Sequence, residues 1–162
     1  MFSVKVFLFL SERRLCPKQW RNFTGFCFFF KQALVLTKPQ AKELCQDQNG
    51  SNLVDIQSKL ENNFVGGLLK EVNVSRRLAF LGIELSKEGL KWDRDGMNVT
   101  YSNWAKVSGL YREPAGIEKC GVIGPEGFWF STQCIFGSTW FPIIVCKKGN
   151  WLSCGKSQLL GR

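Results

Sequence analysis

The arrangement of seven cysteines is the feature that most constrains the fold of this 162-residue chain. None of them forms a Cys-x-x-Cys pair, and the chain contains no histidine. A zinc site would therefore need four thiolates at knuckle spacing, which the sequence does not offer. The spacing favours a disulfide framework, which forms in oxidising compartments. The cysteines are Cys16, Cys27, Cys45, Cys120, Cys134, Cys146 and Cys154.

Four Asn-x-Ser/Thr sequons point to the same kind of compartment. Their asparagines are acceptors for N-linked glycans in the secretory pathway. Together with the cysteines they predict a protein that is secreted or displayed on the extracellular face of the cell. Buried free thiols in a cytosolic protein are the weaker interpretation. The acceptor asparagines are Asn22, Asn49, Asn73 and Asn98.

The absence of histidine also excludes several kinds of catalysis. Ser-His-Asp and Cys-His nucleophiles, HExxH zinc sites and imidazole proton shuttles all need that side chain. Glu113 and Glu118 could suggest the carboxylate pair of a glycosidase, but no second feature supports one. These kinds of catalysis are therefore not expected; the prediction that the chain is not an enzyme rests on the family resemblance described below. No apolar run reaches about 18 residues, so we expect no membrane span in this chain.

The net charge of +9 is concentrated at the two ends of the chain. Residues 1–21 carry five basic side chains and one acidic one, and residues 147–162 carry four basic and no acidic ones. The middle of the chain is nearly balanced. We therefore expect no nucleic-acid partner, because no folded face would carry the positive charge.

Hydrophobic patterning predicts an α+β fold with antiparallel sheets. Thr37 and Ser58 each have the features of an N-cap, so we expect a helix after each of them. Residues 86–118 show little periodicity, which predicts a long loop. Strands are expected at Gly25–Phe30, Ala79–Leu85, Gly121–Ile123, Gly127–Ser131 and Phe141–Cys146.

Short motifs follow one another in order from residue 16 to residue 148. A Cys-Pro-x-x-Trp opening at Cys16 precedes a Phe-Leu-Gly-Ile segment at Phe80. The long loop then holds Trp-Asp-x-Asp-Gly at Trp92 and Tyr-x-Asn-Trp at Tyr101, and a Glu-Pro pair follows at Glu113. In this order the motifs resemble the long form of the C-type lectin-like domain.

The resemblance implies two helices, short antiparallel sheets and a long loop, stapled by disulfides, in a domain at residues 16–148. Residues 1–15 would be a degenerate signal peptide or an upstream segment, and residues 149–162 a basic C-terminal tail. The implied disulfides are Cys16–Cys27, Cys45–Cys146 and Cys120–Cys134; the cysteine count alone does not select this pairing. Cys154 is left over, and it either cross-links a partner chain or is a stray thiol.

The resemblance also bears on calcium. Sugar-binding members hold Ca²⁺ with oxygens from a Glu-Pro-Asn or Gln-Pro-Asp triplet, a later glutamate and a Trp-Asn-Asp motif. Here the triplet ends in Ala115, and Phe130 and Ser131 replace the Asn-Asp pair. Only Glu113 and Glu118 keep their ligand type, whereas calcium needs about six to eight oxygens. We therefore expect no metal and no other cofactor.

Two further features of the family pattern concern packing. We expect Trp92, Tyr101 and Trp104 to fold the long loop onto the core, as their family counterparts do. For Phe130 two interpretations stay open, an exposed ring on a binding face or inward packing. Lys38 is a departure, because it stands where the family often has tryptophan.

The sequence thus predicts an extracellular recognition domain that binds a glycan or a cell-surface or extracellular protein without calcium. The expected face lies near Glu113, Glu118, Phe130 and Ser131. One alternative is calcium-dependent sugar binding at a rebuilt site, in which Asn103 also supplies an oxygen. Another is a structural module of a larger receptor or matrix protein, and a third is a cationic, membrane-active lectin-like protein.

Overall fold

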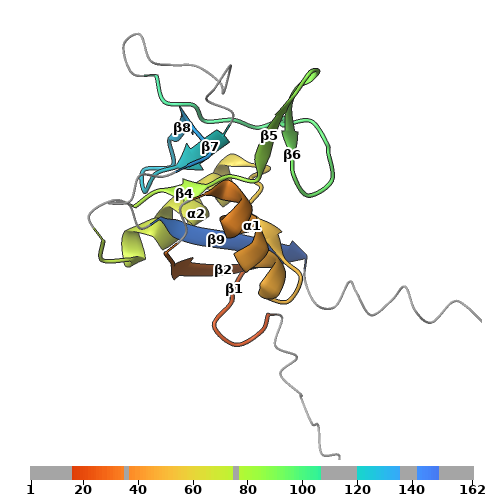
Figure 1. Ribbon diagram of the computed structural model, residues 1–162. Helices are drawn as coiled ribbons and strands as arrows, with labels where there is room; N and C mark the ends of the chain where they lie inside the picture. The colour runs from red at the N-terminus through yellow and green to blue at the C-terminus, as the bar shows by residue number, and fades with distance from the viewer. Residues whose placement is uncertain (1–15, 35–36, 75–76, 107–119, 136–141, 150–162) are drawn as a thin grey trace, which may run out of the picture.

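The structure is a computed structural model, and it describes residues 16–34, 37–74, 77–106, 120–135 and 142–149. In these ranges two helices accompany three antiparallel sheets, which confirms the predicted α+β class. The four-stranded sheet and the helices form one half of the molecule, and the two smaller sheets stand beside them (Figure 1). The helices are α1 (Lys38–Asp47) and α2 (Lys59–Glu71).

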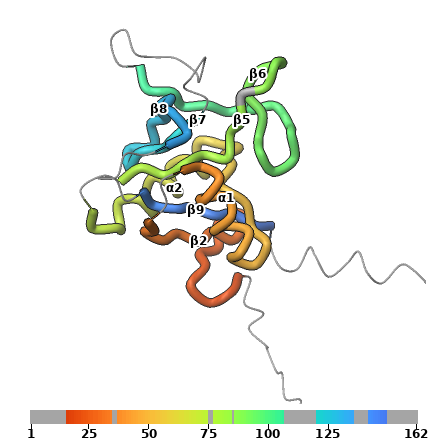
Figure 2. Tube along the Cα trace, viewed as in Figure 1, coloured from red at the N-terminus to blue at the C-terminus, as the bar shows by residue number. Residues whose placement is uncertain are grey.

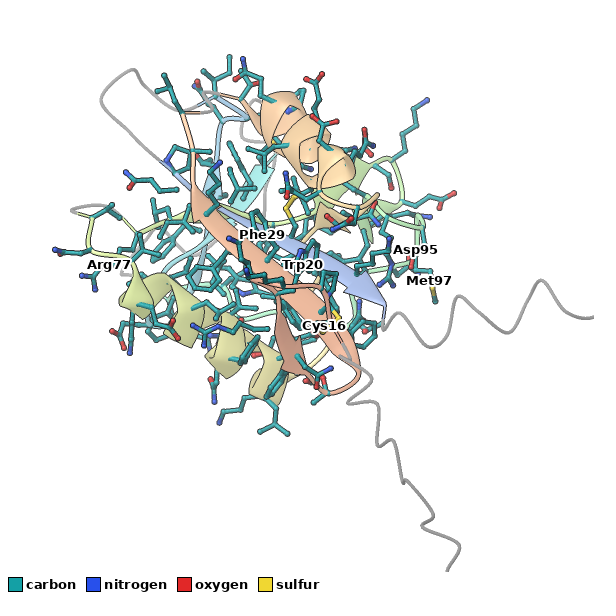
Figure 3. All side chains as sticks on the ribbon, turned by 90° about the horizontal axis from the view of Figure 1, so that it is seen from below. Cys16, Trp20, Phe29, Arg77, Asp95 and Met97 are labelled. Carbon is teal, nitrogen blue, oxygen red and sulfur yellow. A yellow bond between two sulfur atoms is a disulfide. The ribbon has the colours of Figure 1, made fainter. Side chains whose placement is uncertain are left out.

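The largest sheet brings the two ends of the domain together. Strand β2 pairs along its whole length with β9, so that Phe26 faces Gly149. Phe28 and Phe29 of β2 are buried in two different core clusters, on opposite faces of this central strand. Trp20 covers Phe29, with ring centroids 5.5 Å apart (Figure 3). The strand order is β1 (Arg21–Phe23), β2 (Phe26–Gln32), β9 (Ile143–Gly149) and β3 (Asn52–Leu53).

Both predicted helix starts are confirmed. The Thr37 hydroxyl accepts a hydrogen bond from the Gln40 amide, and the Gln40 side chain accepts one from the Thr37 amide, which completes a capping box. The Ser58 hydroxyl likewise accepts from the backbone of Glu61. The Glu61 carboxylate, however, accepts from the Gln57 amide at 2.7 Å instead of closing a second box.

That carboxylate also belongs to a buried ion cluster that ties α2 to β9. The Lys147 ammonium lies 2.5 Å from an oxygen of Glu61 and 3.3 Å from one of Asp55, and it sits 4.3 Å above the ring centroid of Phe26. All three ionic side chains are buried. Lys147, which counts toward the basic C-terminal end in the sequence, is therefore part of the core and not of a solvated tail.

The strand expected over residues 79–85 is divided between two sheets. Its first part pairs with β7, and its second part pairs with β6, inside the segment expected to be a loop. The change of sheet occurs at Gly82, whose amide donates to Val54 O and where a Cβ would lie 2.9 Å from Leu53 O. The strands are β4 (Ala79–Phe80), β5 (Ile83–Ser86), β6 (Gly89–Trp92), β7 (Cys120–Ile123) and β8 (Trp129–Thr132).

Three disulfides staple these elements in the pairing that the family resemblance implies. Cys45–Cys146 joins α1 to β9 across 101 residues, and both of its cysteines are fully buried. The other two close short loops near the chain's first hairpin and around β7 and β8. Cys154, together with residues 1–15 and 150–162, lies outside the described residues. The short pairs are Cys16–Cys27 and Cys120–Cys134.

Candidate functional site

Trp129 of β8 is the centre of an aromatic cluster that holds the long loop against the core. It is fully buried, and three loop rings meet it edge-on. The centroid distances are 6.2 Å for Trp92, 5.8 Å for Tyr101 and 5.5 Å for Trp104. Burial raises the pKa of the Tyr101 phenol. The expectation that these aromatics fold the loop onto the core is confirmed.

The backbone of the loop is also attached to β8. The Trp129 amide donates to Asn103 O at 2.9 Å, and the Ala105 amide donates to Trp129 O at 2.8 Å. These bonds form a parallel bridge between Trp104 and Trp129. Residues 93–106 therefore leave β6, bend back on themselves and return across the molecule to lie along β8 (Figure 2).

A buried amide on α2 fixes the turn between β7 and β8. Asn62 accepts a hydrogen bond from the Trp129 indole N–H at 2.7 Å and donates to Gly127 O at 2.9 Å. The Asn103 side chain donates to the same carbonyl oxygen at 2.8 Å. Gly127 has a φ of +80°, and a Cβ on it would lie 2.6 Å from the Asn62 amide nitrogen. Asn62 thus positions Trp129 of β8 directly, and it holds the Gly127 carbonyl to which the long loop is attached through Asn103.

A cavity of about 350 Å³ opens on this frame. Two of its walls are the phenyl rings of Phe128 and Phe130, which are 49% and 39% exposed. Large aromatic side chains are usually more deeply buried, so a pair of them around one cavity marks a candidate binding face. We call this cavity the ligand face; its lining residues are Asn103, Trp104, Ala105, Lys106, Phe128 and Phe130.

The structure brings together some of the residues expected at the site. Asn103 and Phe130 line the ligand face, while Ser131 follows on β8 as a half-buried residue that does not line it. Glu113 and Glu118 lie outside the described residues. Sequence reasoning missed Phe128 and Lys106. The two-residue spacing from Phe128 to Phe130 places both rings on one side of an extended chain, and this spacing was the available signal.

Sequence reasoning also missed Asn62. It precedes Val65 by three residues and Leu69 by seven, so it falls on the buried stripe of α2. An asparagine on such a stripe signals a buried hydrogen-bonding partner, because an unpaired buried amide is costly. The sequence does not show which groups that partner would be.

The described residues of the ligand face do not fit a calcium ion of the kind that the family's sugar-binding members hold. Calcium takes about six to eight oxygen ligands, and Phe130 supplies none. Ser131, which follows Phe130 on β8, offers only a neutral hydroxyl, and Asn103 offers a single amide oxygen, because its amide nitrogen donates to Gly127 O. Among the residues that the structure describes, no group of three or more His, Cys, Asp or Glu side chains could hold a metal ion.

The chain belongs to the C-type lectin family, because the family model of the Lectin C-type domain matches residues 35–148. Fold, disulfides and the attached long loop agree with that membership. The domains of this family are non-enzymatic modules that bind carbohydrate or protein ligands, and this chain is such a module. No helix within the described ranges has the length and apolar character needed to cross a bilayer.

Individual relatives match most of the chain. The chain is 30% identical to human lymphocyte antigen 75 over 85% of the chain's own length, but this match spans only 8% of lymphocyte antigen 75. It is 36% identical to a coagulation factor IX/factor X-binding snaclec of Gloydius halys, over 63% of this chain and 70% of the snaclec. Among solved structures, the chain is similar to the cow CD23 carbohydrate-recognition domain, which was solved in the presence of a GlcNAc2Man3 oligosaccharide. The two superpose with a TM-score of 0.64 and 28% identity, over 83% of this chain and 95% of the CD23 domain.

Proposed function

We propose that this chain is an extracellular recognition domain that binds a glycan or protein ligand through the ligand face without calcium. The observation that carries the proposal is the pair of exposed rings, Phe128 and Phe130, around one cavity. An apolar ring at a position where the family's sugar-binding members place a calcium ligand suits a protein surface or the apolar face of a sugar. It does not suit a metal.

The ligand face has the physical features of a binding hot spot. Its rings stand on a frame fixed by the Asn62 hydrogen bonds and by the backbone bonds of Trp129, so little conformational entropy remains to be lost on binding. Fully burying a phenylalanine side chain contributes about 1.5–3 kcal/mol, and Phe130 keeps 39% of its surface to bury. Lys106 adds one exposed cation at the edge.

The relatives support both classes of ligand. The name of the snaclec states that it binds coagulation factors, and the CD23 domain was solved in the presence of an oligosaccharide. An aromatic ring can stack on the apolar face of a sugar or pack against a protein side chain, so both classes fit the ligand face.

Extracellular placement of the chain is part of the same proposal. Three disulfides are typical of secreted and cell-surface domains. Each of the four sequon asparagines is exposed, which leaves room for a glycan. We propose that they are glycosylated and that Cys154 either cross-links a partner chain or stays a free thiol. The sequon asparagines are Asn22, Asn49, Asn73 and Asn98.

The test is a screen of the full oxidised chain against an array of natural glycans and an array of extracellular protein domains, in calcium and in EDTA. We expect a ligand that binds equally in both buffers. Phe130→Ala should weaken it by at least tenfold, about 1.4 kcal/mol, because the ring loses its contact. Leu60→Ala is the matched control, since Leu60 is 70% exposed on α2 and does not line the ligand face.

Two outcomes would contradict the proposal. Equal loss of binding in the Leu60 and Phe130 variants would place the contact elsewhere. Binding that disappears in EDTA would favour the alternative of a rebuilt calcium site, in which Asn103, Glu113 and Glu118 supply oxygens.

A further inference from the structure

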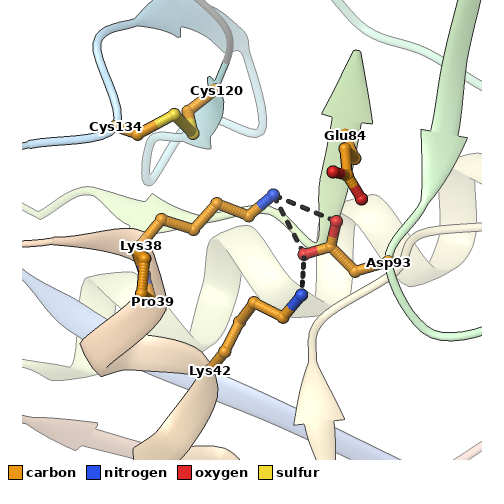
Figure 4. Close-up of a pocket in the computed structure, with 7 residues that line it drawn as sticks. All are labelled: Lys38, Pro39, Lys42, Glu84, Asp93, Cys120 and Cys134. Carbon is orange, nitrogen blue, oxygen red and sulfur yellow. Dashed lines mark hydrogen bonds and ion pairs between the residues drawn. A yellow bond between two sulfur atoms is a disulfide. The ribbon is translucent and has the colours of Figure 1, made fainter. Parts of the chain in front are cut away.

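A second cavity, of about 330 Å³, lies between the start of α1, the β5–β6 hairpin and the Cys120–Cys134 disulfide (Figure 4). It has no lining residue in common with the ligand face. Lys38 and Lys42 reach it from α1, Glu84 from β5, and Asp93 from the residue that follows β6. We call it the charged cavity.

A buried ion pair forms a fixed part of its wall. The Lys38 ammonium lies 2.9 Å from one carboxylate oxygen of Asp93 and 3.1 Å from the other, and it also donates to Ile83 O. Only 8% and 6% of the Lys38 and Asp93 side chains are exposed. Burial lowers the pKa of Lys38, and the Asp93 carboxylate opposes that shift. The Lys38 ammonium donates hydrogen bonds to Ile83 O and to one Asp93 oxygen and forms an ion pair with the other, so this buried lysine serves mainly to join α1 to the hairpin.

Lys42 and Glu84 differ from that pair because their hydrogen-bonding capacity is unused. The Lys42 ammonium is 3.6 Å from Asp93, which is longer than a hydrogen bond, and its side chain is 41% exposed. Glu84 is exposed and its carboxylate accepts no hydrogen bond from a described residue, although its charge interacts with that of Lys38. The α1 side of the charged cavity therefore has two ammonium groups against the Asp93 carboxylate, and the β5 side has the exposed carboxylate of Glu84.

The remaining walls and the size of the charged cavity limit what can enter. Pro39 and the Cys120–Cys134 disulfide provide surface without hydrogen-bond donors. Ligand pockets in proteins usually measure about 300–1,000 Å³, so this cavity suits a small molecule. A simple anion would leave the Glu84 charge facing it, and a simple cation would face Lys42. A small molecule that carries both charges complements both sides.

We propose that the charged cavity binds a free α-amino acid in its zwitterionic form. The carboxylate accepts hydrogen bonds from Lys42, the ammonium donates to Glu84, and an apolar side chain lies against Pro39 and the disulfide. The buried pair of Lys38 and Asp93 holds α1 and the hairpin in place and so sets the separation of the two charges. This site does not depend on the proposed function, because it lies apart from the ligand face.

The test uses ligand-observed NMR on the full oxidised chain with leucine, N-acetyl-leucine and leucinamide. Leucine should bind with a dissociation constant on the order of 1 mM, typical of a small ligand held by few contacts. N-acetyl-leucine lacks the ammonium and leucinamide lacks the carboxylate. Each should bind at least about tenfold more weakly, because each loses one charge-assisted interaction.

Variants then assign the binding to the charged cavity. Lys42→Met and Glu84→Gln should each weaken leucine binding by about tenfold or more. Lys59→Met and Glu43→Gln, exposed charges that do not line the cavity, should leave it unchanged. Phe130→Ala should also leave it unchanged, which separates this site from the ligand face. No saturable leucine signal, or equal binding of all three compounds, would overturn the proposal.

Discussion

Replacing Asn62 with alanine tests whether α2 positions the ligand face. The substitution strands the buried indole N–H of Trp129, which costs about 1–3 kcal/mol when no other acceptor replaces it. Gly127 O loses one donor but keeps Asn103 at 2.8 Å, so its additional cost is small. The higher helix propensity of alanine returns about 0.5 kcal/mol, and the space left by the amide adds about 1 kcal/mol. We therefore expect a net loss of about 1.5–3.5 kcal/mol.

Urea denaturation of the oxidised chain measures this loss as a lower midpoint at an unchanged slope. Asn63→Ala is the matched control, because Asn63 is the exposed neighbour on the same helix. This control should change the free energy of unfolding by no more than about 0.5 kcal/mol. Trp129→Phe removes the indole donor. In that background Asn62→Ala should cost about 1 kcal/mol less than in the parent. Additive effects of the two substitutions, or an Asn62 cost as small as that of the control, would refute the reasoning.

Three other substitutions test the rest of the account. Lys147→Met should cost about 3–5 kcal/mol, because it removes the cation paired with buried Glu61 and leaves buried Asp55 with Arg94 alone. Lys31→Met, at an exposed site of β2, should cost less than about 0.5 kcal/mol, and thermal or urea unfolding compares the two variants. Replacing Cys45 and Cys146 with alanine should cost up to about 4.7 kcal/mol, because this disulfide closes a separation of 101 residues. The same change at Cys16 and Cys27, 11 residues apart, should cost about 2.8 kcal/mol. If unfolding experiments gave the reverse order of the two costs, the chain-entropy explanation would be contradicted. Gly127→Ala should destabilise the fold by at least about 1–2 kcal/mol, because of the positive φ at this position and the clash of a Cβ with Asn62. Gly67→Ala, where a Cβ on α2 would meet open space, should stabilise the fold by up to about 1 kcal/mol. Similar unfolding midpoints for the two variants would count against the close packing around Gly127.

Much of the fold could be predicted because it depends on local or ordered signals. The N-caps at Thr37 and Ser58 are recognisable from a few neighbouring residues, and both helices begin there. The order of the family motifs led to the fold class and to the cysteine pairing that the structure has. The loop aromatics could be assigned to packing because large apolar rings in a polar segment need a place to be buried.

The features that could not be predicted depend on contacts between distant residues. The exchange of sheets at Gly82 is hidden because apolar residues typical of strands stand on both sides of it, Phe80 and Leu81 before it and Ile83 and Leu85 after it. Lys147 counts as part of a basic tail until Glu61 and Asp55 are seen around it. The partners of Asn62 lie 65 and 67 residues away, so no local pattern identifies them.

The ligand face likewise has some features that the sequence predicts and others that only the folded structure shows. Substitution of the calcium ligand positions by Phe130 and Ser131 is readable from the sequence, and it led to the expected loss of metal binding. The cavity itself is not readable, because it depends on how residues 103–106 run beside β8 and on the turn at Gly127. Phe128 and Lys106 join the site only through that arrangement.

Calorimetric titration of the oxidised chain with calcium, paired with thermal unfolding in calcium and in EDTA, tests the central claim most directly. We expect no heat of binding and the same melting temperature in both buffers. A dissociation constant of about 1 mM or tighter, the range of extracellular calcium modules, would contradict it. A melting temperature that falls in EDTA would do the same, because a ligand that binds only the folded state stabilises it.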